Sequence, residues 1–102
     1  MCMKIYLQAR GSYETLLQLS TWCESNDIER IGLPDHYIVG KQRKDKVEPA
    51  PALDLLTAIA GLVRDTESMI YSVLVSPITF RHPSVLLKMA TTINEMAKKR
   101  FR

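Results

Sequence analysis

The 102-residue sequence contains no apolar run close to the roughly 20 residues that a membrane-spanning helix needs. Its first ten residues, MCMKIYLQAR, also lack the long apolar segment of a secretory signal peptide. We therefore predict a cytoplasmic protein with no membrane partner.

Cysteine is scarce, with only Cys2 and Cys23 in the whole sequence. A disulfide framework needs more cysteines, and a zinc site needs about four ligands. The sequence also lacks the G-x-S-x-G, P-loop, C-x-x-C and H-E-x-x-H patterns, which are the usual signatures of acyl transfer, nucleotide hydrolysis, dithiol redox and zinc hydrolysis. We expect two reduced thiols and no metal.

The net charge of +3 has a local origin, because residues 41–46 (KQRKDK) hold four cations and one anion. A second basic cluster, residues 98–102, lies at the end of the chain. No aromatic residue lies among the cations of the first cluster, so stacking of bases is not predicted, and neither is a nucleic-acid partner. We interpret the clusters as a solvated loop and a helix end whose cations complement the helix dipole.

The remaining composition, 46% hydrophobic and 25% charged, is typical of a single soluble domain covering residues 1–102. Hydrophobic periodicity predicts three strands and three helices in the order βαβαβα, which favours an α/β fold with parallel strands joined by right-handed crossovers. The predicted strands are residues 3–8, 29–33 and 69–75, and the predicted helices are residues 13–25, 52–64 and 83–97. Phe101 and Arg102 have the pattern of the start of a fourth strand.

The segment MIYSVLV, residues 69–75, is the strongest strand signal in the sequence. It is short, β-branched and almost uniformly apolar, which predicts a central strand buried on both faces. Ser72 is its polar exception, and its hydroxyl either bonds to backbone or marks a bulge. The run ends at Pro77, and Pro83 suits the first position of a helix.

Residues 38–50 show no periodicity and contain glycine, proline and several charges, so we predict a long loop there. Loops of this length in compact domains are usually lids, binding loops or disordered segments. Pro51 is then expected to open the second helix.

Two polar turns follow predicted strands, at the edge where α/β enzymes carry their chemistry. In the first turn, Asp35 precedes His36, and a carboxylate beside an imidazole could hold one tautomer and move a proton near neutral pH. Asp35 could equally cap backbone in an ordinary Pro-Asp turn. In the second turn, Arg81 and His82 flank a helix start, which is either an anion site or a simple cap.

The two turns together resemble one protein family. GLPDHY at residues 32–37 and SVLVSPITFRHPSVLLKMATTINEMAKKRF at residues 72–101 are similar to the luciferase-like monooxygenase family, especially to its branch that uses the deazaflavin coenzyme F420. The likeness covers nearly the whole chain, and its most specific part is S-V-L-x-S-P-x-T-F-R-H-P.

The resemblance implies a (β/α)8 TIM barrel, of which this chain would supply the first three β/α units. It implies that Asp35 and His36 are the catalytic pair at the cofactor face. It also implies that Ser72 and Val73 form a non-proline cis peptide, a bulge that contacts the cofactor ring together with Leu74. The implied activity is hydride transfer between a small-molecule substrate and the ring of F420, with FMN as the alternative cofactor.

A complete barrel takes about 250 residues, whereas this chain ends where strand four would begin. We therefore expect weak or no turnover from the chain alone, because one wall of a pocket excludes water poorly. The alternative interpretation is a non-catalytic assembly module that pairs its open sheet edges. Its partner would be a second copy, in a homo-oligomer, or a complementary barrel chain.

Overall fold

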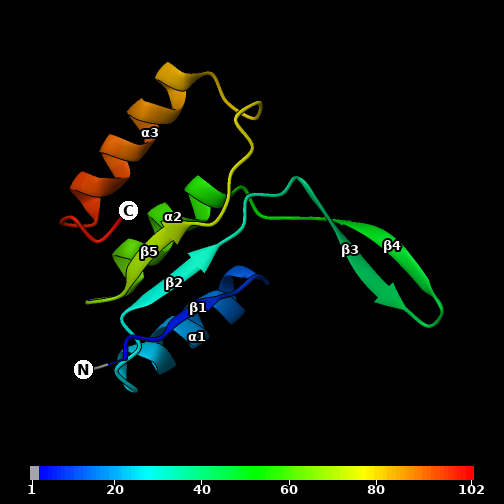
Figure 1. Cartoon of the computed structure of the whole chain (residues 1–102), viewed down its shortest axis with the longest axis horizontal. Helices are drawn as coiled ribbons and strands as arrows, with labels where there is room; N and C mark the ends of the chain where they lie inside the picture. Colours follow the sequence, from blue (N-terminus) through cyan, green and yellow to red (C-terminus); the bar gives the residue numbers. More distant parts are fainter. Residues whose placement is uncertain (1–2) are drawn as a thin grey trace.

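The computed structural model describes residues 3–102, apart from the side chains of residues 41–43 and 48–51. Three parallel strands form one sheet in the order β1-β2-β5, and an antiparallel pair, β3-β4, projects from it as a hairpin (Figure 1). The strands are β1 (Tyr6–Gln8), β2 (Arg30–Leu33), β3 (Ile38–Arg43), β4 (Lys46–Pro51) and β5 (Ile70–Val73). The helices are α1 (Tyr13–Glu24), α2 (Leu55–Asp65) and α3 (Pro83–Met96).

The core lies between the sheet and the helices. Leu7, Ile31 and Tyr71 are neighbours across the sheet, and all three belong to this core or pack against it. Figure 1 shows α1 and α2 behind the sheet. Because successive residues of a strand point to opposite faces, the next row, which contains Gln8 and Ser72, faces away from the helices. The sheet therefore has one face in the core and one face turned away from it.

The predicted fold class is confirmed, since all three strands of the main sheet are parallel and alternate with helices. The expected start of a fourth strand is also present as an isolated parallel bridge between Tyr71 and Phe101. There the Tyr71 amide donates to the carbonyl of Arg100 at 2.8 Å, and the Arg102 amide donates to the carbonyl of Tyr71 at 2.9 Å.

Side-chain caps set the helix ends. Ser12 caps α1, because its hydroxyl oxygen accepts a hydrogen bond from the Thr15 amide. His82 caps α3 by accepting a bond from the Ser84 amide at 3.3 Å, which confirms the simple-cap interpretation. The prediction that Pro51 opens the second helix is wrong. Pro51 ends β4, and α2 begins only after its own cap, Asp54.

Two strands, β1 and β5, are each three residues shorter than predicted. β1 begins at Tyr6 instead of residue 3, because its partner strand β2 itself begins only at Arg30. β5 ends at Val73, and the prediction of burial on both faces is wrong for its extension. Met69 and Tyr71 are almost completely buried, but Leu74 is 47% exposed and Val75 is 67% exposed. The helices cover only one face, which explains the difference.

The long loop predicted for residues 38–50 is instead the β3-β4 hairpin, in which Ile38 pairs with Pro51 and Arg43 pairs with Lys46. The basic segment of residues 41–46 forms its outer end. Ile38 and Val47 are mostly exposed, so the face of the hairpin to which they belong is turned to solvent and imposes no alternating pattern of apolar residues on the sequence. Prolines are tolerated in β4 because this strand has a neighbour on one side only.

Cys23 is a free and fully buried thiol, and burial raises its pKa. The expectation for Cys2 lies outside the described residues. Among the side chains that the structure describes, no group of three His, Cys, Asp or Glu residues could hold a metal. No helix within residues 3–102 has the length and apolar character needed to span a bilayer.

Glu24 joins the end of α1 to the start of β5. One oxygen of its carboxylate accepts hydrogen bonds from the backbone amides of Glu67, Ser68 and Met69 at 2.7–3.0 Å. Burial raises the pKa of Glu24, whereas the hydrogen bonds from these amides lower it. The combined effect of the bonds is larger, so the pKa of Glu24 lies below its usual 4.5. The ionised carboxylate therefore stabilises the folded chain.

This linkage predicts a pH-dependent stability. Since the pKa of Glu24 is lower in the folded chain, its contribution is complete above about pH 4.5 and is lost as the pH falls through the folded pKa. In urea titrations, Glu24→Gln should be less stable than the wild type at neutral pH, and the gap should close in acid. Glu95→Gln, at an exposed position of α3, is the control. An equal gap at pH 7 and pH 3 would contradict the linkage.

Candidate functional site

The chain segments that follow β2 and β5 lie beside each other at the carboxyl edge of the sheet. The Leu74 amide donates to the carbonyl of Leu33 at 2.8 Å, and the Asp35 amide donates to the carbonyl of Val75 at 3.1 Å. Between these two bonds, the Leu74–Val75 peptide is cis. The two strand ends are thus held together across a non-proline cis peptide.

A cis peptide was expected in this strand, but its predicted position is wrong by two residues. Ser72 and Val73 continue the regular parallel pairing of β5 with Gly32 and Leu33, so no bulge forms there. Ser72 does not bond to backbone either, because its buried hydroxyl oxygen has no hydrogen-bond partner in the structure. Of the three residues expected to contact a cofactor here, only Leu74 belongs to the cis link.

Gln8 of β1 and Gly32 of β2 support the cis link from the other two strands of the sheet. The side-chain amide of Gln8 donates to the carbonyl of Leu74 at 3.0 Å. A Cβ atom at Gly32 would lie only 3.1 Å from Cδ2 of Leu74, so glycine leaves the room that the leucine side chain occupies. We call Gln8, Gly32, Leu74 and Val75 the platform. Its two apolar residues, Leu74 and Val75, are exposed.

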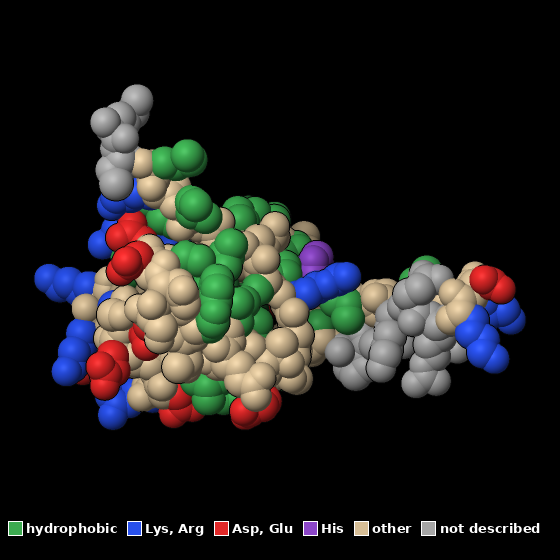
Figure 2. Space-filling view, turned by 90° about the horizontal axis from the view of Figure 1, so that it is seen from below, with side chains coloured by type: hydrophobic (Ala, Val, Ile, Leu, Met, Phe, Trp, Pro, Cys, Tyr) green, Lys and Arg blue, Asp and Glu red, His purple; other side chains and the backbone are tan. Residues whose placement is uncertain are grey.

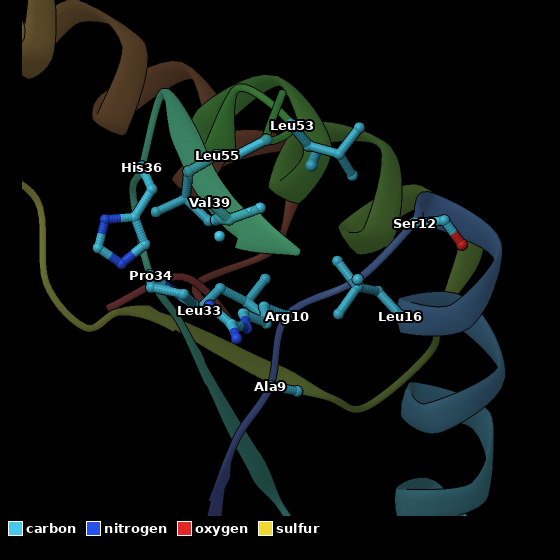
Figure 3. Close-up of a pocket in the computed structure, with 14 residues that line it drawn as sticks. Ala9, Arg10, Ser12, Leu16, Leu33, Pro34, His36, Val39, Leu53 and Leu55 are labelled. Atoms are coloured by element: carbon cyan, nitrogen blue, oxygen red, sulfur yellow. The ribbon is translucent and has the colours of Figure 1, made fainter. Parts of the chain in front are cut away.

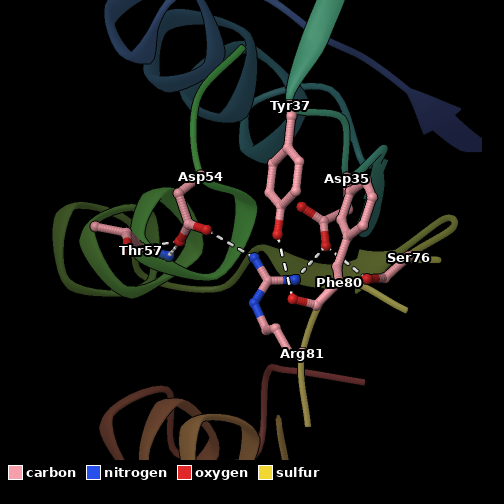
Figure 4. Close-up of polar contacts among 7 residues, drawn as sticks. All are labelled: Asp35, Tyr37, Asp54, Thr57, Ser76, Phe80 and Arg81. Atoms are coloured by element: carbon pink, nitrogen blue, oxygen red, sulfur yellow. Dashed lines mark hydrogen bonds and ion pairs between the residues drawn. The ribbon is translucent and has the colours of Figure 1, made fainter. Parts of the chain in front are cut away.

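Asp35 follows the end of β2 at this edge and is 1% exposed. One oxygen of its carboxylate accepts hydrogen bonds from the Ser76 hydroxyl, at 2.5 Å, and from the Arg81 guanidinium (Figure 4). Arg81 also forms an ion pair with Asp54, the cap of α2, at 2.7 Å. The hydrogen bond to Asp35 outweighs burial and raises the pKa of Arg81. Asp35 and Arg81 thereby fix the loop after β5 against both β2 and α2.

A ring stack reinforces the same connection. Tyr37 and Phe80 lie with ring centroids 3.9 Å apart and planes 8° from parallel, and the Tyr37 hydroxyl donates to the Phe80 carbonyl at 3.2 Å. Sequence reasoning missed this stack and the Asp54 contact, and for Arg81 it offered only a place beside a helix start that was either an anion site or a simple cap. A buried aspartate almost always needs a cation, which is the signal that could have linked Asp35 to Arg81.

The structure does not bring the predicted pair, Asp35 and His36, into contact with each other. Asp35 points to Ser76 and Arg81, whereas His36 is exposed and lines a pocket. Within the described residues, no hydrogen bond joins the two side chains. The prediction that Asp35 holds the imidazole in one tautomer is therefore wrong.

His36 stands at one end of an open pocket of about 600 Å³, with Leu16 and Ser12 at the other end (Figure 3). The pocket lies between the β1-α1 connection, the end of β2, the hairpin and the start of α2. Its lining residues are Ala9, Arg10, Gly11, Ser12, Leu16, Leu33, Pro34, His36, Val39, Gly40, Ala52, Leu53, Leu55 and Ala58. A smaller pocket of about 320 Å³ adjoins it and is lined by Gln8, Ala9, Arg10, Pro34 and His36.

Comparison with known proteins gives a match in structure only. No family model and no curated protein matches the sequence. Among solved structures, the chain is similar to the oxygenating constituent of 3,6-diketocamphane monooxygenase from the CAM plasmid of Pseudomonas putida, a Type II Baeyer-Villiger monooxygenase in complex with FMN. The TM-score is 0.75 over 98% of this chain, at 13% sequence identity, and the match spans 28% of that protein. The chain therefore has the fold of one segment of a TIM barrel.

Proposed function

We propose that this chain forms part of the ring-binding site of a flavin-dependent oxidoreductase that acts on a small molecule. The observation that carries the proposal is the exposed apolar surface of Leu74 and Val75 at the carboxyl edge of the sheet, beside the Gln8 side-chain amide that holds the Leu74 carbonyl. Support comes from the structural neighbour, whose own complex contains FMN. The neighbour is a longer protein, and this chain matches 28% of its length.

The residues present fit a flat ring with an apolar face and a polar edge. Leu74 and Val75 offer exposed apolar surface for the face of the ring. Gln8 and Ser72 offer an amide and a hydroxyl on the same side of the sheet. The Ser72 hydroxyl oxygen is buried without a partner, and such an atom is the kind of group that a bound ligand can satisfy.

Each residue has a defined part in this proposal. Gln8 holds the Leu74 carbonyl and so orients the platform. Asp35 acts through Arg81 and Ser76 as a positioning residue for the loop after β5. His36 is exposed at the pocket, where its imidazole nitrogens can donate or accept a hydrogen bond. A bound flavin or deazaflavin would supply the hydride chemistry.

The choice of cofactor remains part of the proposal. The neighbour's complex favours FMN, whereas the resemblance of residues 72–101 to the luciferase-like family favours F420. Assembly with a second copy or with a complementary barrel chain likewise stays a prediction.

Fluorescence titration with FMN and with F420 tests the proposal. We expect a saturable change with one of them below roughly 100 µM, which corresponds to about −5.5 kcal/mol. Leu74→Ser should weaken binding about tenfold, because losing about 50 Å² of apolar contact costs about 1.3 kcal/mol. Ile78→Ser, on the same loop and 88% exposed, is the matched control.

Two outcomes would reject the proposed ring site. One is the absence of a saturable change with either cofactor. The other is an equal loss of affinity in Leu74→Ser and Ile78→Ser, which would place the ring elsewhere.

A further inference from the structure

We propose that the outer edge of β3, in the projecting hairpin, is a docking site for an extended acidic segment of another protein, which adds to the hairpin as a third strand. The backbone of the partner hydrogen-bonds to β3, and its acidic side chains pair with the basic residues of the hairpin. This docking site is independent of the proposed ring site, because it lies on a different sheet.

The hairpin lacks the cover that such a structure usually needs. An isolated two-stranded hairpin is only marginally stable in water, and a third strand or a packed helix stabilises it. Within the described residues, β3 and β4 have only each other as strand neighbours. Figure 2 shows the hairpin extending away from the rest of the molecule, with side chains of both charges at its outer end. A strand that joins the hairpin would therefore stabilise it.

The register of the hairpin determines which backbone groups face outward. A two-residue turn, residues 44–45, joins the strands, so Arg43 and Lys46 form a hydrogen-bonded pair beside it. Hydrogen-bonded and non-hydrogen-bonded pairs then alternate along the hairpin. The Ala52 amide donates to the Tyr37 carbonyl at 3.1 Å, which fits the same alternation at the inner end. Residues of the non-hydrogen-bonded pairs therefore direct their amides and carbonyls away from the partner strand.

The two outer edges of the hairpin differ in their hydrogen-bond donors. The outward positions of β4 are Val47, Pro49 and Pro51, and the two prolines have no N–H to donate. The outward positions of β3 all have an N–H, and they are Ile38, Gly40 and Gln42. Ile38 and Gly40 are exposed. Only β3 therefore offers an unbroken row of donors and acceptors to an added strand.

The charge of the hairpin selects an acidic partner. Lys41 and Arg43 belong to the same face of β3, because alternate residues of a strand share a face. An added strand would lie about 4.8 Å from β3, so its own alternate residues would lie beside these two cations. Opposite charges in such cross-strand pairs are stabilising and like charges are destabilising. The edge therefore fits an acidic segment better than a second copy of β3, which has the same cations.

Fluorescence anisotropy of labelled peptides tests the chemistry of the partner. The probe is a peptide of alternating glutamate and valine, as long as β3, and the control is the same peptide with lysine in place of every glutamate. With the full chain, the glutamate peptide should bind saturably and at least about tenfold more tightly than the lysine peptide. Its affinity should fall as salt is raised from about 0.01 M to 1 M, because the charges are exposed.

Hydrogen exchange measured by NMR tests the location of the site in the unaltered chain. The glutamate peptide should slow exchange of the outward amides of Ile38, Gly40 and Gln42 at least about tenfold and leave the amide of Val47 unchanged. In addition, Gln42→Pro removes one outward donor of β3 and should weaken the peptide about tenfold. Val47→Pro, at the paired position of β4, is the matched control and should keep the affinity.

Three results would overturn the inference. The first is equal binding of the glutamate and lysine peptides, or slower exchange at Val47 instead of at the three amides of β3. The second is slower exchange of those three amides when the protein concentration alone is raised, which would assign the edge to a second copy. The third is binding of a short DNA duplex without binding of the glutamate peptide, which would assign the cations to a nucleic acid.

Discussion

Replacing Arg81 with methionine is expected to lower the free energy of unfolding by about 3–5 kcal/mol. The change removes the cation that faces Asp35, which is 1% exposed, and leaves a buried carboxylate without compensation. It also breaks the ion pair with Asp54. A loss of this size is a large fraction of the roughly 5–15 kcal/mol by which most domains are stable, so urea unfolding at pH 7 should detect it readily.

Two further variants separate charge from packing. Arg64→Met, on the exposed side of α2, should change stability by less than about 0.5 kcal/mol. The double variant Arg81→Met with Asp35→Asn should recover part of the loss, because it removes the buried charge as well as its partner. If Arg81→Met behaved like Arg64→Met, the buried ion pair would not contribute to stability and the loop after β5 would not depend on it.

The second large effect is expected at Arg100, whose replacement by methionine should cost about 3 kcal/mol. Its guanidinium donates to the carbonyls of Val63, Thr66 and Met69 at 2.5–3.2 Å and to the Thr66 hydroxyl at 3.3 Å. These carbonyls lie at the end of α2 and in the turn before β5, where helical backbone partners are missing. Arg100 therefore connects the last residues of the chain to the α2-β5 turn.

Arg100→Lys and Arg102→Met are the matched variants. Lysine keeps the charge but lacks the planar set of donors. The free energy of unfolding of Arg100→Lys should therefore lie between that of the wild type and that of Arg100→Met. Arg102 is exposed, and its replacement should have little effect. Circular dichroism during urea titration measures all three variants. Equal stability of Arg100→Met and Arg102→Met would show that the α2-β5 turn does not need the guanidinium.

Much of the fold was predictable because its determinants are local. The periodicity of α1 and α3 and the caps Ser12 and His82 are visible in the sequence, and so is the run that forms β5. The hairpin was missed because a two-stranded ribbon outside the core imposes no alternation on its residues. The length of β1 depends on where its partner β2 begins, and the pattern of β1 itself carries no such information.

Less of the candidate site could be predicted. Asp35 was expected at a strand end, but its partner Arg81 lies 46 residues away, and no local pattern selects that contact. Asp35 and His36 diverge because consecutive residues of an extended chain point to opposite sides. Ser72 was taken to mark the irregular peptide. Its actual position is on the sheet face turned away from the helices, where a polar residue does not disturb the core.

The most direct test of the central claim, that the platform receives the cofactor ring, is a residue-resolved NMR titration of the ¹⁵N-labelled chain with FMN and with F420. We expect the amide signals of Gly32, Leu74 and Val75 to shift most, in a saturable manner and with one common affinity. Largest shifts at residues 98–102 or on the outer surface of α3, with the platform amides unmoved, would contradict it.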